Sequence, residues 1–244
     1  MSYKENKKQM RVKQLQQFIN IQKLDWVGLS ANANAINMLE NNPDYIDWSN
    51  LSLNPNAIRM LENNLDKVNW KNLSKNPSAI GILRNNVNKI CWRSLSQNPN
   101  AISLLEMYPD NISWDYIALN PHAMNIIERN LDKIYWNFLN ANPNAIHLLK
   151  DNHDKLSFKY LSQNPEGIEL LELYPDNIRY DQLSLNPNGM RLIKEHLEYC
   201  KNNGLGDDLD WNKLSENPKT LQILKDNPNK INWYCLSMNE SIFQ

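Results

Sequence analysis

Histidines, cysteines and carboxylates are the side chains that could carry catalytic or metal-binding chemistry, and their spacing indicates neither. His147 and His153 lie six residues apart, which is not the i, i+4 spacing of a helical zinc pair. Three cysteines without a C-x-x-C pair fit neither a disulfide framework nor a zinc site, and they indicate a reducing compartment. Some glutamates share one sequence slot, which favours a solvated surface row over an acid–base pair: Glu62, Glu106, Glu128 and Glu172.

The sequence also lacks the motifs of common enzyme classes. It contains no P-loop, no G-x-S-x-G and no G-x-G-x-x-G segment. We therefore expect a protein that is not an enzyme and that binds no metal and no cofactor.

Charge and hydropathy exclude two further classes. The 26 basic and 27 acidic residues leave a net charge of −1, without the basic excess of a general nucleic-acid or membrane binder. No stretch approaches the roughly 20 apolar residues that cross a bilayer. The segment "MSYKENKKQMRVKQLQQF" lacks the apolar core of a secretory signal. These features predict a soluble intracellular protein.

Tryptophan and proline mark a tandem repeat. From Trp26 to Trp136 a tryptophan recurs every 22 residues, and Phe158 and Tyr180 continue the slot. Trp211 then comes nine residues late, and Trp233 follows at the normal step. Eight prolines follow an asparagine seven residues after the aromatic residue, and four others lie five residues before it. We count ten units, with the first and the last incomplete.

A longer period is superimposed on the short one. Pro43, Pro109 and Pro175 are 66 residues apart, and "MYPDNI" and "LYPDNI" match across the same distance. This pattern indicates duplication of a three-repeat block.

The composition of one unit, residues 47–68, predicts two short helices. Asn54–Pro55 is typical of a helix start, and the apolar residues that follow have helical spacing. Trp48 lies three residues before Leu51, on one helical face. Capping residue types immediately precede the aromatic residue in this and other units, as Asp47, Asn69, Ser113, Ser157, Asp210 and Asn232. Such helices become stable only by packing against neighbouring units, with the tryptophan as a wedge. The predicted fold is all-α, a right-handed-type α-solenoid of about ten 22-residue helix–turn–helix repeats.

The rival interpretation is a leucine-rich repeat, whose period of about 20–29 residues also fits. In that fold a strand supplies alternating inward side chains. Ser52, Ser74 and Ser96 stand where an inward leucine is required, so the sequence favours the α-helical fold.

The ends and one insertion differ from the regular units. Residues 1–23 are predicted to form an N-terminal capping helix, and residues 24–244 a single repeat array. The insertion within residues 197–210 suggests an extended helix followed by a flexible loop, and a tolerated surface insertion is favoured over a functional loop. The C-terminal end, "LSMNESIFQ", stops where a second helix should begin. We expect this end to be poorly capped and to offer an edge for self-association.

Stretches such as "LDKVNWKNLSKNPSAI" and "LDKIYWNFLNANPNAI" carry a resemblance. The repeated W-x-x-L-S-x-N-P-x-A-I-x-L-L pattern resembles that of tandem-repeat proteins of unknown function encoded in multiple copies by giant DNA viruses. The resemblance covers residues 24–244 and implies a viral protein inside an infected cell, in the host cytoplasm or in the virion. It implies no catalytic residue.

Two rows of side chains are candidate partner-binding sites. The first is the most variable slot of the helix that follows Asn-Pro; it would read a partner if that helix lined a concave surface, and a drifting solvent face is the alternative. Its candidate residues are Arg59, His147, Glu169 and Arg191. The second row is aromatic in three consecutive units, as Tyr116, Phe138 and Tyr160. Packing under a neighbouring helix is the alternative for this row.

These observations predict a non-enzymatic scaffold that binds a host or viral protein. An RNA reader with one base per repeat is an alternative, but the mixed charges of the variable row disfavour nucleic acid. A virion component that stacks through its C-terminal end is a third hypothesis.

Overall fold

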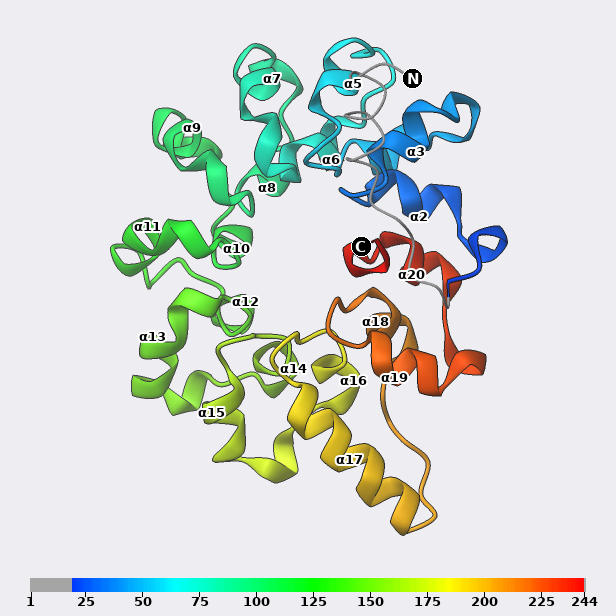
Figure 1. The fold of residues 1–244 in the computed structure, drawn as a ribbon. Helices are drawn as coiled ribbons and strands as arrows, with labels where there is room; N and C mark the ends of the chain where they lie inside the picture. Colours follow the sequence, from blue (N-terminus) through cyan, green and yellow to red (C-terminus); the bar gives the residue numbers. More distant parts are fainter. Residues whose placement is uncertain (1–18, 244) are drawn as a thin grey trace, which may run out of the picture.

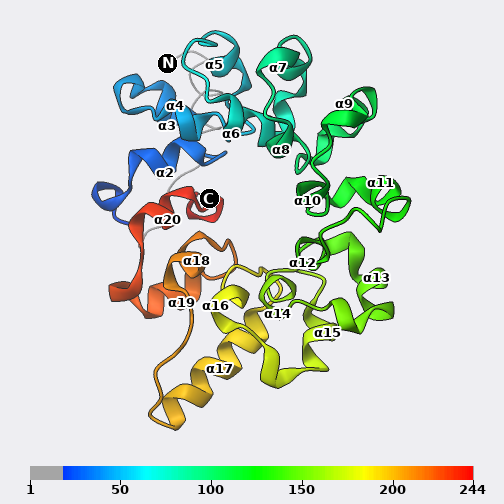
Figure 2. The same ribbon diagram turned by 180° about the vertical axis from the view of Figure 1, so that it is seen from behind.

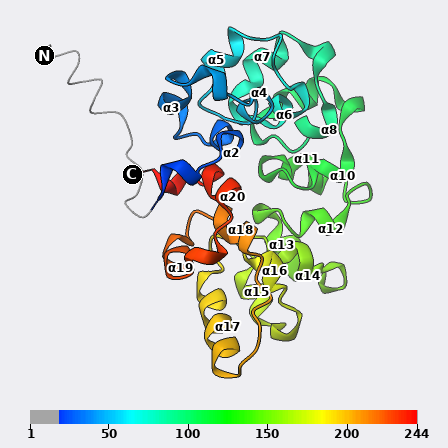
Figure 3. The same cartoon turned by 90° about the vertical axis from the view of Figure 1, so that its right-hand side faces the viewer.

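The computed structural model describes residues 19–243, which form α-helices and short 3-10 helices and contain no β-strand. The all-α prediction is therefore confirmed, and the leucine-rich repeat is excluded. The helices follow the 22-residue period and are arranged in a ring, with two helices per repeat (Figure 1). The same ring is seen from behind in Figure 2 and from the side in Figure 3.

The helix that begins at the aromatic slot lies on the inner side of the ring (Figure 1). These inner helices are α2 (Trp26–Ala31), α4 (Trp48–Leu51), α6 (Trp70–Lys75), α8 (Trp92–Leu95), α10 (Trp114–Ile117), α12 (Trp136–Leu139), α14 (Phe158–Leu161), α16 (Tyr180–Leu183), α18 (Trp211–Glu216) and α20 (Trp233–Met238). The side chains of Asp47, Asn69, Asp210 and Asn232 cap their helices as predicted, whereas those of Ser113 and Ser157 make no cap bond.

The second helix of each repeat lies on the outer side of the ring (Figures 1 and 2). These outer helices are α3 (Ile36–Glu40), α5 (Ile58–Glu62), α7 (Ile80–Arg84), α9 (Ile102–Met107), α11 (Met124–Glu128), α13 (Ile146–Asp151), α15 (Ile168–Glu172), α17 (Met190–Asn202) and α19 (Leu221–Asp226). Apart from α17, these helices have five or six residues, because the Asn-Pro segment begins a 3-10 turn in several repeats and the α-helix starts three residues after the proline.

Short 3-10 helices complete the connections between helices. They are η1 (Ile21–Lys23), η2 (Pro43–Tyr45), η3 (Pro77–Ala79), η4 (Val87–Lys89), η5 (Pro99–Ala101), η6 (Pro109–Asn111), η7 (Pro121–Ala123), η8 (Pro143–Ala145), η9 (His153–Lys155), η10 (Pro175–Asn177), η11 (Pro228–Lys230) and η12 (Glu240–Ile242). The predicted N-terminal capping helix lies outside the described residues, except for its last part, which contains η1.

The core is a continuous seam of aliphatic side chains that runs through the repeats. Each central repeat contributes a leucine or isoleucine from the inner helix and aliphatic residues from the outer helix, as Leu95, Leu104 and Leu105 do with no exposed surface. The outer helix starts against a small residue such as Ala101, which is also fully buried. The prediction of a shared apolar seam between units is confirmed.

The tryptophans occupy the edge of this seam and not its centre. They are half-buried, and one face packs on the core. A lysine nineteen residues later in the chain lies over the ring in several repeats, with Nζ 4.7 Å from the centroid of Trp48 and 4.8 Å from that of Trp114. Cation–π attraction therefore explains the lysine of the recurring "D-K" segment, which the sequence analysis left without a role.

Buried asparagine links each repeat to the one before it. Asn98, which has no exposed surface, donates from Nδ2 to the carbonyl oxygens of Ser74 and Asn76 in the preceding repeat, at 3.1 and 2.9 Å. Its Oδ1 accepts from the backbone N–H of Asn100. The same pattern recurs around the ring at Asn32, Asn54, Asn76, Asn120, Asn142, Asn164, Asn186, Asn217 and Asn239. Asn-Pro therefore caps its own turn and binds the neighbouring repeat.

A buried serine forms a second link at most joints. The hydroxyl of Ser96 donates to Trp92 O at 2.9 Å and accepts from the backbone N–H of Ser113 in the next repeat at 3.0 Å. Asn140 takes over this role in its repeat with its amide group. Ala118 occupies the slot once and has no polar group to offer to the N–H of Tyr135.

Ala118→Ser is expected to raise the free energy of unfolding by about 1 kcal/mol, because it supplies the missing link to Tyr135. Thermal unfolding followed by circular dichroism measures the change. Ser96→Ala, which removes the same link one repeat earlier, is expected to lower stability by a similar amount. A lower melting temperature for the Ala118→Ser protein would contradict the prediction.

The first and last repeats meet and close the ring. Helix α20 lies beside α2 in all three views (Figures 1–3). Asn32 Nδ2 donates to the carbonyl oxygens of Ser237 and Asn239, at 2.9 and 3.1 Å. The predicted free C-terminal edge is therefore wrong: the sequence pattern showed that the last unit is incomplete, but not that the first unit covers it.

Candidate interaction site

Three neighbouring inner helices place an aromatic cluster on the ring, defined here as Tyr116, Phe138 and Tyr160. The ring centroids of Tyr116 and Phe138 are 5.3 Å apart in a tilted arrangement. Those of Phe138 and Tyr160 are also 5.3 Å apart, with the rings edge to face. Because the slot falls at the same place on α10, α12 and α14, a period of 22 residues brings the three side chains into contact.

The aromatic cluster is partly exposed and carries a cation at each end. All three side chains are half-buried. The guanidinium of Arg93 lies 4.3 Å from the Tyr116 centroid, and its Nη2 donates to the Tyr116 hydroxyl at 2.6 Å. The Nζ atom of Lys159 lies 5.5 Å from the Tyr160 centroid. The surface can therefore contact apolar groups at its centre and negatively charged groups at its ends.

Tyr135 widens the aromatic cluster. It lies one residue before α12, and its ring packs edge to face on Phe138 at 5.0 Å while 44% of the residue stays exposed. The sequence analysis missed Tyr135, because its slot is polar in most other repeats.

The other predicted row lies on the outer helices. Arg59, His147, Glu169 and Arg191 are exposed on α5, α13, α15 and α17, on the outer side of the ring (Figure 1). The premise that this helix lines the concave surface is therefore wrong. The period is the same for both helices of a repeat, so the sequence could not decide which of them faces inward.

Several residues of this outer row form ion pairs between neighbouring repeats. Glu169 accepts from Lys150 at 3.4 Å, and His147 Nε2 lies 3.1 Å from Glu128. Arg191 bonds to Glu172 of the preceding repeat and to Glu195 of its own helix. These pairs are exposed, so each contributes about 1 kcal/mol or less to stability. These contacts explain several of the charged side chains of the outer row without a binding partner.

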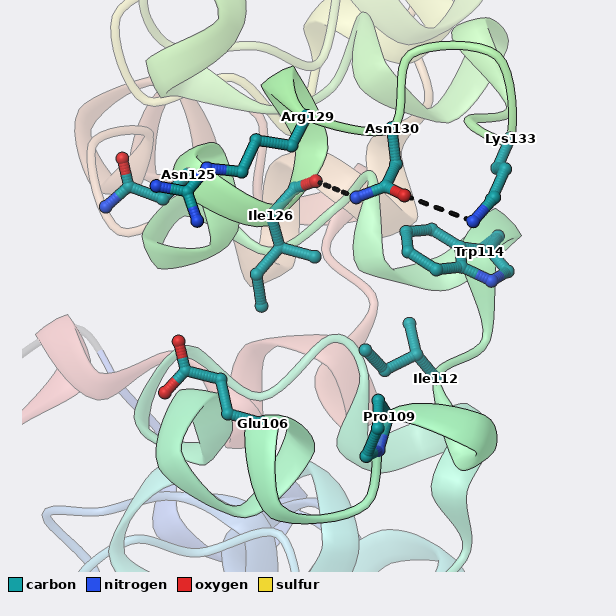
Figure 4. Close-up of a pocket in the computed structure, with 9 residues that line it drawn as sticks. All are labelled: Glu106, Pro109, Ile112, Trp114, Asn125, Ile126, Arg129, Asn130 and Lys133. Atoms are coloured by element: carbon teal, nitrogen blue, oxygen red, sulfur yellow. Dashed lines mark hydrogen bonds between the residues drawn. The ribbon is translucent and has the colours of Figure 1, made fainter.

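Grooves open on the outer side between repeats. The groove in Figure 4 has a volume of about 400 Å³ and lies between α9 and α11. Glu106 of α9 lies on one side and Ile126 of α11 on the other, with Ile112 and Trp114 at one end. A corresponding groove of about 550 Å³ lies 66 residues earlier in the chain, with Trp48 in the place of Trp114. The 66-residue period of the sequence therefore repeats the surface as well as the fold.

The insertion forms an extended helix and a loop, as predicted. α17 continues to Asn202, and the loop returns so that Asp208 Oδ1 lies 2.5 Å from His196 Nε2. Cys200 Sγ lies 3.5 Å from the same nitrogen atom. A nucleophile–base–acid relay needs contacts at two different ring nitrogens, so these three residues do not form one. The imidazole stacks on Tyr180, with centroids 3.6 Å apart.

Asp207 anchors the end of the inserted loop to the following repeat. Burial raises the pKa of this carboxyl group, but hydrogen bonds from Lys230 Nζ at 2.6 Å and Trp211 Nε1 at 2.8 Å favour the charged form more strongly. The pKa of Asp207 therefore lies below its ordinary value. These contacts support the interpretation of the insertion as a surface element that packs on its neighbours.

Among residues 19–243, no group of three or more histidine, cysteine or acidic side chains is placed to hold a metal ion. In the same part of the chain, no helix has the length and apolar character to span a bilayer. Comparison with family models, curated proteins and solved structures finds no match. The fold itself defines the class: a closed ring of tandem two-helix repeats.

Proposed function

We propose that this ring is a non-enzymatic scaffold that binds another protein through the aromatic cluster of Tyr116, Phe138 and Tyr160. The observation that carries the proposal is the contact among three partly exposed aromatic rings on consecutive inner helices. Aromatic side chains with an accessible face are typical anchors of protein interfaces. A ring of interlocked repeats would hold them at fixed spacing and so lower the entropy lost on binding.

The charges at the ends of the cluster indicate the kind of partner. Arg93 and Lys159 favour a segment with large apolar side chains flanked by acidic residues. We propose a host or viral protein as the source of that segment, on the strength of the resemblance to giant-virus repeat proteins. We also propose that the protein acts in the host cytoplasm or in the virion. A right-handed sense of the repeat array is a further proposal.

A peptide-display selection on the immobilised ring tests the proposal. We expect enrichment of peptides that combine acidic and large apolar residues. Binding of such a peptide, followed by fluorescence anisotropy, is expected to weaken at least tenfold in the triple variant Tyr116→Ala, Phe138→Ala and Tyr160→Ala.

A control double variant tests whether truncating any exposed apolar side chains would lower the affinity equally. Met107 and Leu173 are 62% and 66% exposed and lie at the ends of outer helices, so Met107→Ala with Leu173→Ala is expected to leave the affinity unchanged. Urea unfolding of both variants checks that the ring is intact. Equal affinity of the triple variant and the parent protein would remove the cluster as the binding surface.

Single-stranded RNA is the second candidate ligand, because bases stack on aromatic rings beside cations. Asp115 adds negative charge next to Tyr116 and disfavours it. Salt-dependent binding of arbitrary RNA that is lost in the triple variant would favour the RNA reader over the protein scaffold.

A further inference from the structure

The joint between the last and first repeats reproduces the bonds of the internal joints. The backbone N–H of Asp25 donates to Ser237 Oγ at 2.8 Å, as that of Cys91 donates to Ser74 Oγ at 3.0 Å. Asn32 joins the last repeat as Asn98 joins its predecessor. Lys23 lies 5.2 Å from the Trp233 centroid, which repeats the lysine–tryptophan contact. We call this joint between α20 and α2 the seam, as distinct from the aliphatic core that runs through all the repeats.

One residue distinguishes the seam from the other joints. Gly28 occupies the slot two residues after the aromatic residue, where the other repeats carry Asn50, Asn72, Ser94, Tyr116, Phe138, Tyr160, Gln182, Lys213 and Cys235. A Cβ atom at Gly28 would lie 2.6 Å from Tyr234 O and 2.9 Å from Ser237 Cβ. The inner helices approach too closely at the seam for any side chain in this slot, so Gly28 permits closure.

The seam also differs in its connectivity. At an internal joint, the two repeats are linked directly by the polypeptide, whereas α2 and α20 stand at opposite ends of the described chain. Parting the seam would leave an open arc with two edges, which carry Leu29 and Leu236, both at least 99% buried in the ring. The edges are complementary to each other, and therefore to those of a second copy.

We propose that the seam is an exchangeable interface, at which the ring opens and pairs with a second copy of this chain. The first repeat of one chain binds the last repeat of the other, and the reciprocal contact closes the dimer. The exchange disturbs no connection between repeats, because α2 and α20 lie at opposite ends of the described residues. The bonds are those already present in the ring, so the proposal requires no new surface and is independent of the aromatic cluster.

Two matched pairs of variants test the proposal. Ser237→Ala and Ser74→Ala remove the same hydroxyl group, which accepts one inter-repeat bond and donates to the carbonyl of the aromatic residue, but only the first lies at the seam. Gly28→Ala obstructs the seam, whereas a Cβ atom at Gly81 meets nothing within 4 Å. Protein with two different fluorescent labels is mixed, and exchange is followed by energy transfer and by sedimentation velocity.

We expect Ser237→Ala to form mixed dimers at least tenfold faster than Ser74→Ala and the parent ring, because it weakens the seam alone. Gly28→Ala obstructs the same contact in ring and dimer, so it is expected to form neither and to sediment more slowly than Gly81→Ala, as an open arc. A circular permutant keeps the test valid if Gly28→Ala proves unstable. In it, residues 1 and 244 are joined through a glycine–serine linker, and the chain opens between Leu205 and Gly206, in the exposed inserted loop. In this permutant Ser237→Ala is expected to cause no exchange above the permutant's own rate. Equal exchange for Ser237→Ala and Ser74→Ala in the original ring, or the same acceleration by Ser237→Ala in the permutant as in the original ring, would overturn the proposal.

Discussion

Asn98→Ala is expected to lower the free energy of unfolding by about 3 kcal/mol, because three hydrogen bonds lose the same side chain. The buried carbonyl oxygens of Ser74 and Asn76 and the partly buried N–H of Asn100 would each lose a partner. An unsatisfied buried polar group costs about 1–3 kcal/mol, and the lost side-chain volume adds to this. Urea unfolding followed by circular dichroism measures the effect.

Asn100→Ala is the matched control two residues away. The Asn100 side chain is exposed and donates one bond, to Pro77 O at 3.0 Å, so its loss is expected to cost less than about 1 kcal/mol. Asn98→Asp is expected to be worse than Asn98→Ala, because a carboxylate would face two carbonyl oxygens without donating to either. Equal stability of Asn98→Ala and Asn100→Ala proteins would show that the asparagine ladder does not hold the ring together.

Leu105→Ala is expected to cost about 3 kcal/mol, since it opens a cavity in the continuous aliphatic seam. Leu105 has no exposed surface and lies on α9 between neighbouring repeats. Every repeat in a closed ring packs against two neighbours, so the cavity weakens the packing between repeats. The same urea titration reports the change.

Met107→Ala serves as the comparison on the same helix. Met107 is 62% exposed, and its truncation is expected to change stability by less than about 0.5 kcal/mol. A difference of less than 1 kcal/mol between the Leu105→Ala and Met107→Ala proteins would contradict the assignment of the ring core. A single unfolding transition in both is expected if the repeats of the ring unfold together.

The sequence by itself determined the repeat, its two helices and its apolar seam. A period of 22 residues, with aromatic, Asn-Pro and aliphatic slots at constant offsets, leaves few alternatives to a stack of helical hairpins. The caps at Asp47 and Asn69 and the helix that extends to Asn202 followed from local residue types. These features depend on contacts between residues close in the chain, or one period apart, which a single sequence displays directly.

Tertiary structure decided the roles of the residues that recur from repeat to repeat and the side of the ring on which each helix lies. Asparagine of Asn-Pro was identifiable as a helix cap, but its two bonds to the preceding repeat depend on how closely the repeats approach. The tryptophans were expected to fill the joints, yet buried asparagine, serine and leucine do so, and lysine covers the half-buried rings. The contact among Tyr116, Phe138 and Tyr160 was indicated by their common slot, whereas its cations and Tyr135 come from other slots.

Closure of the ring was outside the reach of the repeat pattern. Whether a tandem array advances as an open superhelix or returns on itself depends on a small rotation per repeat, summed over ten units. Each unit's sequence constrains that rotation only weakly, because the same slots tolerate a range of crossing geometries. The sequence analysis gave Gly28 no role, and only the approach of α20 to α2 gives it a physical reason.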